Sequence, residues 1–390
     1  MMHPLSLSRD SRAKSRDSRA NALVWGVRRA GLLLGTVLLL GSAVACDEQG
    51  SVTEAPEETD PSETIEGPSY ENPALARDFP DPSVLQAPDG TYYAYATETL
   101  IDGEFTNIQM ATSPDLVDWT WTGDALPGGV PWAQERRSYW APHVVRDAER
   151  DRYIMYFSAH HDTKDGKCLA VATAESPAGP FTARDEPLLC GDGFENIDPM
   201  AFEDPQSDAH YLYWGSHGEP IRVRELADNR TAFREGTEAT PVVHPDPDEP
   251  YGGLIEGAWT VYRDGFYYLF YSGDNCCGEN AHYAVMVARA ESPTGPFETL
   301  GDANGTNRSI ILTANDTWKA PGHNSVIQDA DGTDWMVYHA INRDQPTRPT
   351  GTGTRWDRRV MLMDSIAYDD GWPRIPGQSP SAVSPAPTTE

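Results

Sequence analysis

Basic residues are scarce in this 390-residue chain, which has 30 Lys and Arg against 60 Asp and Glu and a formal net charge of −30. This imbalance argues against nucleic acid or an anionic membrane surface as a partner, because both would repel the protein. Cysteine is limited to five residues, and neither a CxxC pair nor an HExxH motif indicates zinc. A convincing amphipathic helix is also missing, while Gly/Pro turns and short alternating strands are frequent. We therefore expect an all-β protein, long enough to bury a sizeable core.

The N-terminus has the charge pattern of an export signal. Seven Lys and Arg residues precede the apolar stretch AGLLLGTVLLLGSAVAC, which is too short to span a bilayer comfortably and ends in small residues. That ending resembles a bacterial lipobox. We expect residues 1–45 to be removed as a signal peptide and Cys46 to carry the lipid that anchors the exported protein, at the cell surface or in the periplasm. A plain secretory signal is the alternative.

Two segments are too polar to fold alone. Residues 46–70 contain no Lys or Arg and almost nothing apolar, which predicts a disordered acidic tether. The tail GQSPSAVSPAPTTE predicts disorder over 376–390. The folded domain then covers about 71–375.

Four cysteines belong to this folded part. Cys168 and Cys190 bracket a short segment and could join one pair of strands by a disulfide in an oxidising compartment. Cys276 and Cys277 are adjacent, and a disulfide between them would be strained.

Five segments repeat the same pattern of a turn followed by a short aromatic strand. They are DGTYYAYAT, RDRYIMYFS, DAHYLYWGS, DGFYYLFYS and DGTDWMVYH. With Tyr92, Tyr153, Tyr211, Tyr267 and Trp335 taken as equivalent, the intervals are 61, 58, 56 and 68 residues. Five all-β repeats predict a five-bladed β-propeller of four-stranded blades. A β-sandwich is the alternative, but it does not require a fivefold period.

The repeat also locates polar residues on the strands that line the propeller axis. Counting back about ten residues from each aromatic gives Asp81, His143, Asp198, Glu256 and His323. Five ionisable side chains in one channel are costly to bury without a function. Glycoside hydrolysis needs a protonated acid and an ionised base, and the apolar neighbours of Glu256 favour its protonated form. Metal binding is less favoured, because no single loop supplies several calcium ligands.

At these residues the chain resembles glycoside hydrolase family 43, five-bladed propeller enzymes that act on arabinan and xylan side chains. The motifs DPSV, IDPMAFED and IEGAW stand one per blade in the family's order. The resemblance implies that Asp81 is the general base and Glu256 the general acid. It implies that Asp198 orients Glu256 and keeps its pKa high, and that the anomeric carbon is inverted.

Shorter matches give further candidates. Trp140, His143, Asn196 and Arg359 are expected to contact substrate, with core packing of Trp140 and a surface ion pair of Arg359 as alternatives. The family often has an acid in the position of His143. The resemblance places His323 near a calcium ion or water cluster on the axis, and a hydrogen-bonded histidine is the alternative. No cofactor is expected beyond that structural Ca²⁺.

The expected function is inverting hydrolysis of arabinose-containing polysaccharide or oligosaccharide, by an α-L-arabinofuranosidase or an endo-1,5-α-L-arabinanase. The double cysteine at 276–277 resembles that of arabinanases and favours this substrate. A β-xylosidase is the alternative on the same fold, because loops around the pocket select the sugar. A non-catalytic glycan-binding propeller is a third hypothesis, against which the intact catalytic triplet of Asp81, Asp198 and Glu256 argues. We expect a monomer.

Overall fold

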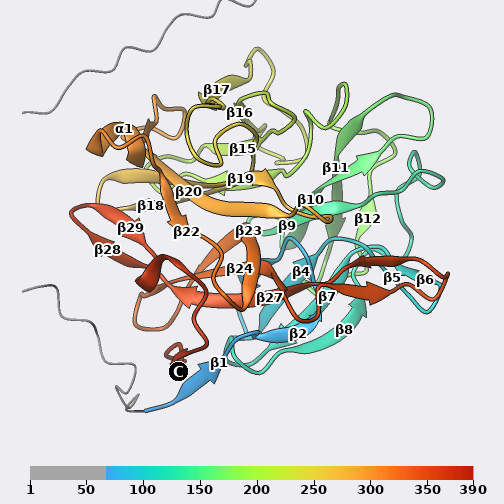
Figure 1. The fold of residues 1–390 in the computed structure, drawn as a ribbon. Helices are drawn as coiled ribbons and strands as arrows, with labels where there is room; N and C mark the ends of the chain where they lie inside the picture. Colours follow the sequence, from blue (N-terminus) through green and yellow to red (C-terminus); the bar gives the residue numbers. More distant parts are fainter. Residues whose placement is uncertain (1–66, 390) are drawn as a thin grey trace, which may run out of the picture. The chain divides into compact units, whose positions relative to one another are not determined.

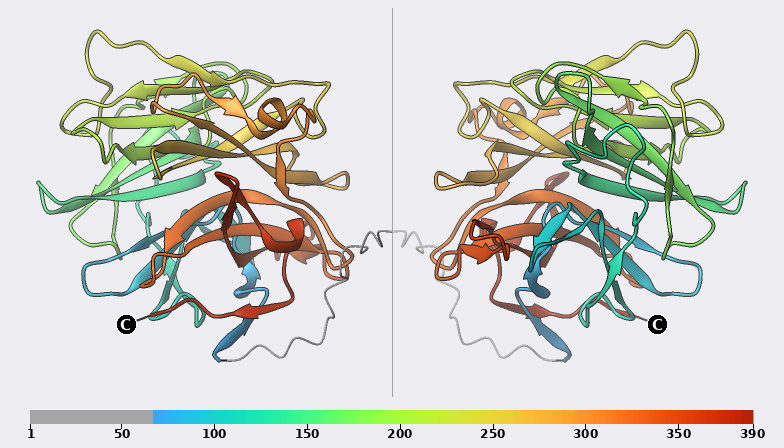
Figure 2. Two further views of the ribbon diagram at one scale, coloured as in Figure 1. Left: turned by 90° about the vertical axis from the view of Figure 1, so that its left-hand side faces the viewer. Right: turned by 90° about the vertical axis from the view of Figure 1, so that its right-hand side faces the viewer.

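The computed structural model describes residues 67–389, in which thirty strands and very little helix form a five-bladed β-propeller (Figures 1 and 2). The fold prediction is confirmed. The helical elements are α1 (Leu300–Asn304) and the 3-10 turn η1 (Pro376–Gln378). No helix in residues 67–389 is long and apolar enough to cross a membrane.

The first three blades follow one another along the chain. The first contains β3 (Ser83–Gln86), β4 (Tyr92–Ala96), β7 (Gln109–Ser113) and β8 (Thr120–Asp124). The second contains β9 (Trp140–Asp147), β10 (Arg152–His160), β11 (Lys167–Ala174) and two short outer strands, β12 (Thr182–Ala183) and β13 (Leu189–Cys190). The third contains β14 (Met200–Glu203), β15 (His210–Trp214), β16 (Ile221–Glu225) and β17 (Thr240–Val243).

The fourth and fifth blades complete the ring. The fourth contains β18 (Ile255–Arg263), β19 (Phe266–Asn275), β20 (His282–Ala290), β21 (Glu298–Thr299) and β22 (Ile310–Leu312). The fifth contains β23 (Trp318–Gln328), β24 (Asp334–Asn342), β27 (Arg359–Ser365) and the N-terminal β2 (Leu75–Asp78). Four two-stranded sheets of the described residues lie outside the blades. One joins the two ends of the described chain, and the others are β5 (Thr99–Ile101) with β6 (Glu104–Thr106), β25 (Thr347–Pro349) with β26 (Arg355–Asp357), and β28 (Ala367–Asp369) with β29 (Trp372–Arg374).

Both ends of the described chain are ordered, so the prediction of a disordered tail over 376–390 is wrong for 376–389. The tail forms η1 and then β30 (Val383–Pro385), which pairs with β1 (Ser69–Glu71). A short polar segment can be ordered in this way without a core of its own, because an existing strand satisfies its backbone groups. The expected tether also ends before residue 70, since β1 begins at Ser69. The predicted signal peptide and Cys46 lie outside the described residues.

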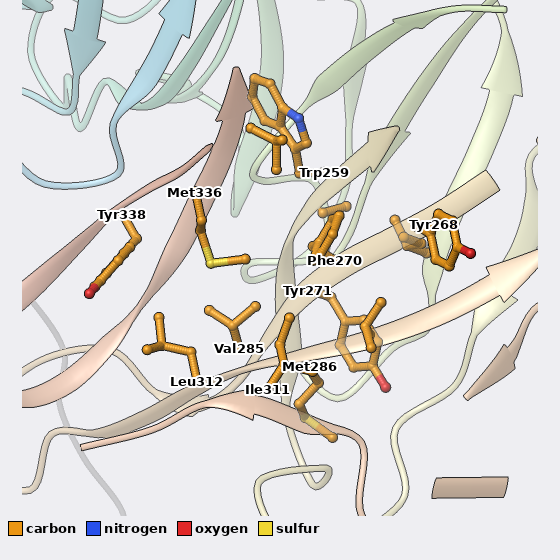
Figure 3. Packing of buried hydrophobic residues seen from close by; sticks show 14 of the residues in the cluster. Trp259, Tyr268, Phe270, Tyr271, Val285, Met286, Ile311, Leu312, Met336 and Tyr338 are labelled. Atoms are coloured by element: carbon orange, nitrogen blue, oxygen red, sulfur yellow. The ribbon is translucent and has the colours of Figure 1, made fainter. Parts of the chain in front are cut away.

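Large apolar side chains fill the space between neighbouring blades. The largest cluster joins the third, fourth and fifth blades, and it includes Tyr268, Phe270, Tyr271, Met336 and Tyr338 (Figure 3). These side chains come from the second strand of each blade, where the sequence repeat places its aromatics. A blade is covered on both faces, so its inner strands are almost continuously apolar instead of alternating.

Candidate active site

Left-handed backbone geometry occurs on each innermost strand or within two residues before it. The residues at equivalent positions are Asp81, Ala141, Asp198, Gly257 and His323, with φ between 49° and 62°, and β23 also contains Ala320 with φ 50°. The predicted register was therefore wrong at two of its five positions. His143 lies two residues after the equivalent position, and Glu256 lies one residue before it. Register shifts occur close to both positions, between β9 and β10 and between β18 and β19.

Asp81 is a buried carboxylate whose two oxygens both accept hydrogen bonds. Arg359 Nη1 donates to Oδ1 at 2.8 Å, and Thr97 Oγ1 donates to Oδ2 at 2.5 Å. His339 Nδ1 lies 3.1 Å from the same Oδ1 and accepts the backbone N–H of Asp81 at 3.2 Å. Burial by itself would raise the pKa of Asp81, but Arg359, followed by His323 and His339, holds that pKa well below its usual range. Asp81 is therefore ionised.

Glu256 is held between two hydroxyl groups. Ser216 Oγ donates to Oε2 at 2.5 Å, and the Tyr283 hydroxyl donates to Oε1 at 2.9 Å. Gly322 makes room for this tyrosine, because a Cβ at that position would lie only 2.3 Å from its ring. Burial raises the pKa of Glu256 more than these two hydrogen bonds lower it, and the charge of Asp81 adds to the increase.

Asp198 connects these two carboxyl groups. Its Oδ2 accepts the backbone N–H of Gly257 at 3.2 Å, directly beside Glu256, and its own N–H donates to Ser158 Oγ at 3.0 Å. Burial, and then the charges of Glu256 and Asp81, raise the pKa of Asp198 well above its usual range. Because Asp198 and Glu256 repel each other when both are ionised, the pair titrates as a unit and keeps a proton beyond the ordinary carboxyl range.

His323 lies on the axis between two carboxylates, with Nδ1 3.6 Å from Asp81 Oδ1 and 3.8 Å from Asp198 Oδ2. The adjoining axial cavity of about 20 Å³ is lined by both carboxylates, His323 and Asn324. Neither polar side-chain atom of Asn324 has a hydrogen-bond partner there, which suits a single water. Residues 67–389 contain no group of three or more His, Cys, Asp or Glu placed to hold a metal. The residues that line the axial cavity suit a water better than a protein-ligated ion. The axial calcium remains a prediction.

Trp140 and Arg359 both line a cleft of about 600 Å³ that opens beside Thr97. Phe194 stacks on the Trp140 ring at 5.8 Å between centroids, and Lys167 Nζ lies 3.1 Å from the centre of the same ring. The predicted substrate contact of Trp140 is compatible with this position, since the residue is only half-buried. Arg359 forms an ion pair with Asp81, so the expected alternative of a surface pair is replaced by a pair inside the site.

Asn196 and His143 have other hydrogen-bond partners in the structure. Asn196 is buried, and its Oδ1 accepts the indole N–H of Trp214 at 3.1 Å. His143 Nδ1 accepts the backbone N–H of Ala201 at 2.8 Å, and its ring packs edge-on against Trp259. Burial lowers the pKa of His143 to about 3, so the ring is neutral. These contacts support structural roles for both residues, with His143 at the wall of the axial cavity.

Both cysteine pairs are bonded. The disulfide between Cys168 and Cys190 joins β11 to β13, with 4.1 Å between the Cα atoms. Cys276 and Cys277 form a vicinal disulfide at the end of β19, and Cys277 lines the same cleft as Trp140.

The sequence analysis did not single out four residues that contact the carboxyl groups: Thr97, Ser216, Tyr283 and His339. They lie on or just after the second and third strands of their blades, whereas counting back from the aromatics locates only residues of the innermost strands. The signal that could have found them is the repeat itself, since YYAYAT, YLYWGS and WMVYH each carry a polar residue shortly after the aromatic pair.

A carboxyl group with a lowered pKa and another with a raised pKa are the two kinds of group that a glycoside hydrolase needs. The model of the family "Glycosyl hydrolases family 43" matches residues 70–373, and the chain belongs to this family.

Several named relatives match most of the chain. It is 28% identical over 327 residues to "Probable arabinan endo-1,5-alpha-L-arabinosidase A" of Aspergillus flavus, covering 78% of this chain and 94% of the relative. It is 30% identical over 318 residues to the beta-D-galactofuranosidase xynD of Aspergillus niger, covering 78% and 84%. Among solved structures, a thermostable family-43 glycoside hydrolase matches with a TM-score of 0.66 and 25% identity, covering 82% of this chain and all of that one.

Proposed function

We propose that the protein is an inverting glycosidase that cleaves arabinose-containing glycans, with Asp81 as general base and Glu256 as general acid. The observation that carries this proposal is the opposite direction of the two pKa shifts within one site. A base must be ionised and an acid must be protonated at the working pH, and similar carboxyl groups reach those states only through different surroundings.

The proposed reaction is a single displacement. Asp81 removes a proton from water as the water attacks the anomeric carbon, while Glu256 gives its proton to the departing glycosidic oxygen. Arg359 keeps Asp81 ionised before the attack and stabilises its position by the 2.8 Å hydrogen bond. Asp198 fixes the backbone beside Glu256 through its hydrogen bond from Gly257, while burial and the charge of Asp81 raise the pKa of the acid.

The choice of sugar rests on the relatives. The names of several relatives state action on arabinan, including the extracellular endo-alpha-(1->5)-L-arabinanase 1 of Bacillus subtilis, which is 24% identical over 309 residues. The named galactofuranosidase acts on another furanoside. We therefore place an α-L-arabinofuranosyl unit at the site, and a β-D-galactofuranoside and a β-D-xyloside belong in the same substrate panel.

The test compares Asp81→Asn and Glu256→Gln with the wild type on linear arabinan and on the 4-nitrophenyl glycosides of these three sugars. Each variant should lose at least a hundredfold in kcat on the substrate that the wild type cleaves, because each lacks a proton-transfer group. Proton NMR of the first product should show the β-anomer from an α-linked substrate. A wild type that binds arabinan but cleaves none of the panel would contradict the proposal and favour a glycan-binding protein.

We also infer that the protein is exported and held at the membrane through lipid on Cys46. The support is the lipobox-like sequence, together with relatives named as extracellular. In a bacterial host, the full chain should partition into detergent with the membrane fraction, and Cys46→Ala should release it from that fraction. A membrane-bound Cys46→Ala variant would contradict the anchor, and a soluble wild type would favour the plain secretory signal.

A further inference from the structure

Exposed aromatic side chains gather around the cleft. In residues 67–389 the large hydrophobic side chains with high exposure are Phe105, Phe194, Trp356 and Val383. Phe194 stacks on Trp140 at the site, while Phe105 and Trp356 contact each other at 6.5 Å between ring centroids. Phe105 lies on β6 and Trp356 on β26, in hairpins that belong to no blade. The fold of the propeller therefore does not require either ring.

Hydrogen bonds from the main chain and from an arginine side chain hold the two hairpins together. The backbone N–H of Gly103 donates to Thr350 O at 2.9 Å, and Arg348 Nη1 donates to Leu100 O at 2.6 Å. Gly351 allows the close approach, because a Cβ there would lie 2.5 Å from the Cα of Asp102. β5 and β6 extend from the first blade at the edge of the propeller (Figure 1). The two aromatic rings are thus held on a supported surface that segments far apart in sequence build together.

Each ring is also backed by an arginine. The guanidinium carbon of Arg137 lies 4.4 Å from the centre of the Phe105 ring, and that of Arg348 lies 5.4 Å from the centre of the Trp356 ring. Arg348 is itself fixed, since it is buried and pairs with Asp78 at 2.7 Å. Cation–π contact on one face orients each ring, and exposed fractions of 45% for Phe105 and 37% for Trp356 leave the remaining surface available.

The aromatic pair is continuous with the catalytic centre. Trp356 lines the cleft of about 600 Å³ that also contains Arg359 and Trp140, and Arg359 donates to the base Asp81. The chain runs from β26 into β27 with only Arg358 between them. Arg355 and Asp357 flank Trp356 and also line the cleft, so polar groups surround the apolar ring. A ring of this kind beside a polar rim suits the mixed apolar and hydroxylated faces of a sugar.

We propose that Phe105 and Trp356 form a second sugar-binding platform, which holds units of an arabino-oligosaccharide beyond the pair joined by the cleaved bond. This inference rests on the proposed function, because it takes the catalytic substrate to be a furanosyl chain. The platform determines preference for substrate length. It contributes binding energy for longer chains and leaves the cleavage of a single glycosyl unit unaffected.

The experiment measures kcat/KM for Phe105→Ala, Trp356→Ala and the double variant on 4-nitrophenyl α-L-arabinofuranoside and on α-1,5-arabino-oligosaccharides of two to six units. We expect kcat/KM of each single variant to fall about tenfold on the longest substrates and to stay within twofold of wild type on the chromogenic substrate. Most of the loss should lie in KM, because the platform is remote from the reacting atoms. Trp356→Phe should restore much of the activity on long substrates.

Val383→Ala is the matched control, since Val383 is similarly exposed but lies on β30 and does not line the cleft. It should show no dependence on chain length. A wild type that prefers longer chains, combined with Phe105 and Trp356 variants that keep this preference, would overturn the platform while leaving the proposed function intact. Failure of the wild type on every arabinose substrate would remove the basis of both. Unfolding midpoints close to wild type show that an altered length dependence does not come from misfolding.

Discussion

At the scale of single residues, the two carboxyl groups proposed as base and acid differ in their neighbours. Asp81 has a guanidinium donor at 2.8 Å, whereas Glu256 has only hydroxyl donors and lies near other acids. A full positive charge offsets the cost of burying an anion, and neutral hydroxyl groups offset it only in part. The proposed acid and base therefore differ because a charged guanidinium group contacts one carboxyl group and only neutral hydroxyl groups contact the other.

Arg359→Gln tests the origin of the low pKa of Asp81. Activity requires ionised Asp81 and is lost as the pH falls through its pKa. Removing the positive charge raises that pKa, so the acid limb of the kcat/KM profile should move to higher pH by about one unit or more. Arg358→Gln, which changes the exposed neighbouring arginine, should leave the limb in place. An unmoved acid limb in Arg359→Gln would mean that other groups keep Asp81 ionised.

Tyr283→Phe tests the opposite limb. Activity requires a protonated acid and falls as the pH rises through the pKa of the pair formed by Asp198 and Glu256. The Tyr283 hydroxyl stabilises ionised Glu256, so its removal should raise that pKa and move the alkaline limb upward by up to about one unit. Tyr271→Phe, a change in a core tyrosine of β19, should not move it. A downward shift would show that the hydroxyl donates mainly to the protonated form.

At the scale of elements, left-handed backbone geometry recurs at the equivalent position of every inner strand, and three of these five positions are occupied by Asp81, Asp198 and His323. A non-glycine residue in this conformation is sterically strained, and such strained residues are often found at functional sites. The second blade also has a covalent constraint. The disulfide between β11 and β13 lies just before the loop whose Phe194 stacks on the Trp140 ring.

Replacing both Cys168 and Cys190 by serine should lower the free energy of unfolding by about 2–4 kcal/mol, as expected when a cross-link that closes a long loop is removed. The bond spans 22 residues, whereas the vicinal bond spans one. The control Cys276→Ser/Cys277→Ser should therefore lose much less. Urea unfolding of both variants measures the difference. Equal losses in the two variants would contradict an effect of loop closure.

At the scale of the whole molecule, both ends of the described chain close the propeller. β2 supplies the outermost strand of the fifth blade beside β27, and β1 pairs with β30. The tail also reaches the turn between β23 and β24, where Ala330 donates its N–H to Thr388 O at 3.0 Å. Closure by strands from both ends joins the first and last repeats without a covalent bond.

Truncation after Gln378 removes β30 and tests this closure. The loss of its backbone pairing should reduce the free energy of unfolding by on the order of 2–4 kcal/mol and speed hydrogen exchange at residues 69–71. Ser384→Ala keeps the backbone pairing and should change little. Activity at low temperature should remain, because β30 contributes no residue to the cleft. Unchanged stability of the truncated protein would show that β2 closes the ring alone.

The sequence located those candidate site residues that occupy the same position in successive blades. Asp81 and Asp198 occupy equivalent positions and were found by their period, while Glu256 was found although it lies one residue out of register. Asn196 was expected to contact substrate, but it accepts a hydrogen bond from Trp214, a contact between residues 18 positions apart. The register shift that follows the pair of His143 and Tyr156 could not be read from spacing, because a bulge adds one residue without changing the polarity pattern.

The sequence alone predicted the number of blades, the order of the family motifs and the candidate cysteine pair that joins β11 to β13, because each follows from a period or a short spacing along the chain. Only the tertiary structure decided which residue lowers the pKa of Asp81, because Arg359 lies 278 positions from Asp81 and reaches it only when the fifth blade meets the first. The same closure orders the polar tail and brings Phe105 against Trp356. Contacts between the two ends of a ring depend on the closed shape and leave no local pattern in the sequence.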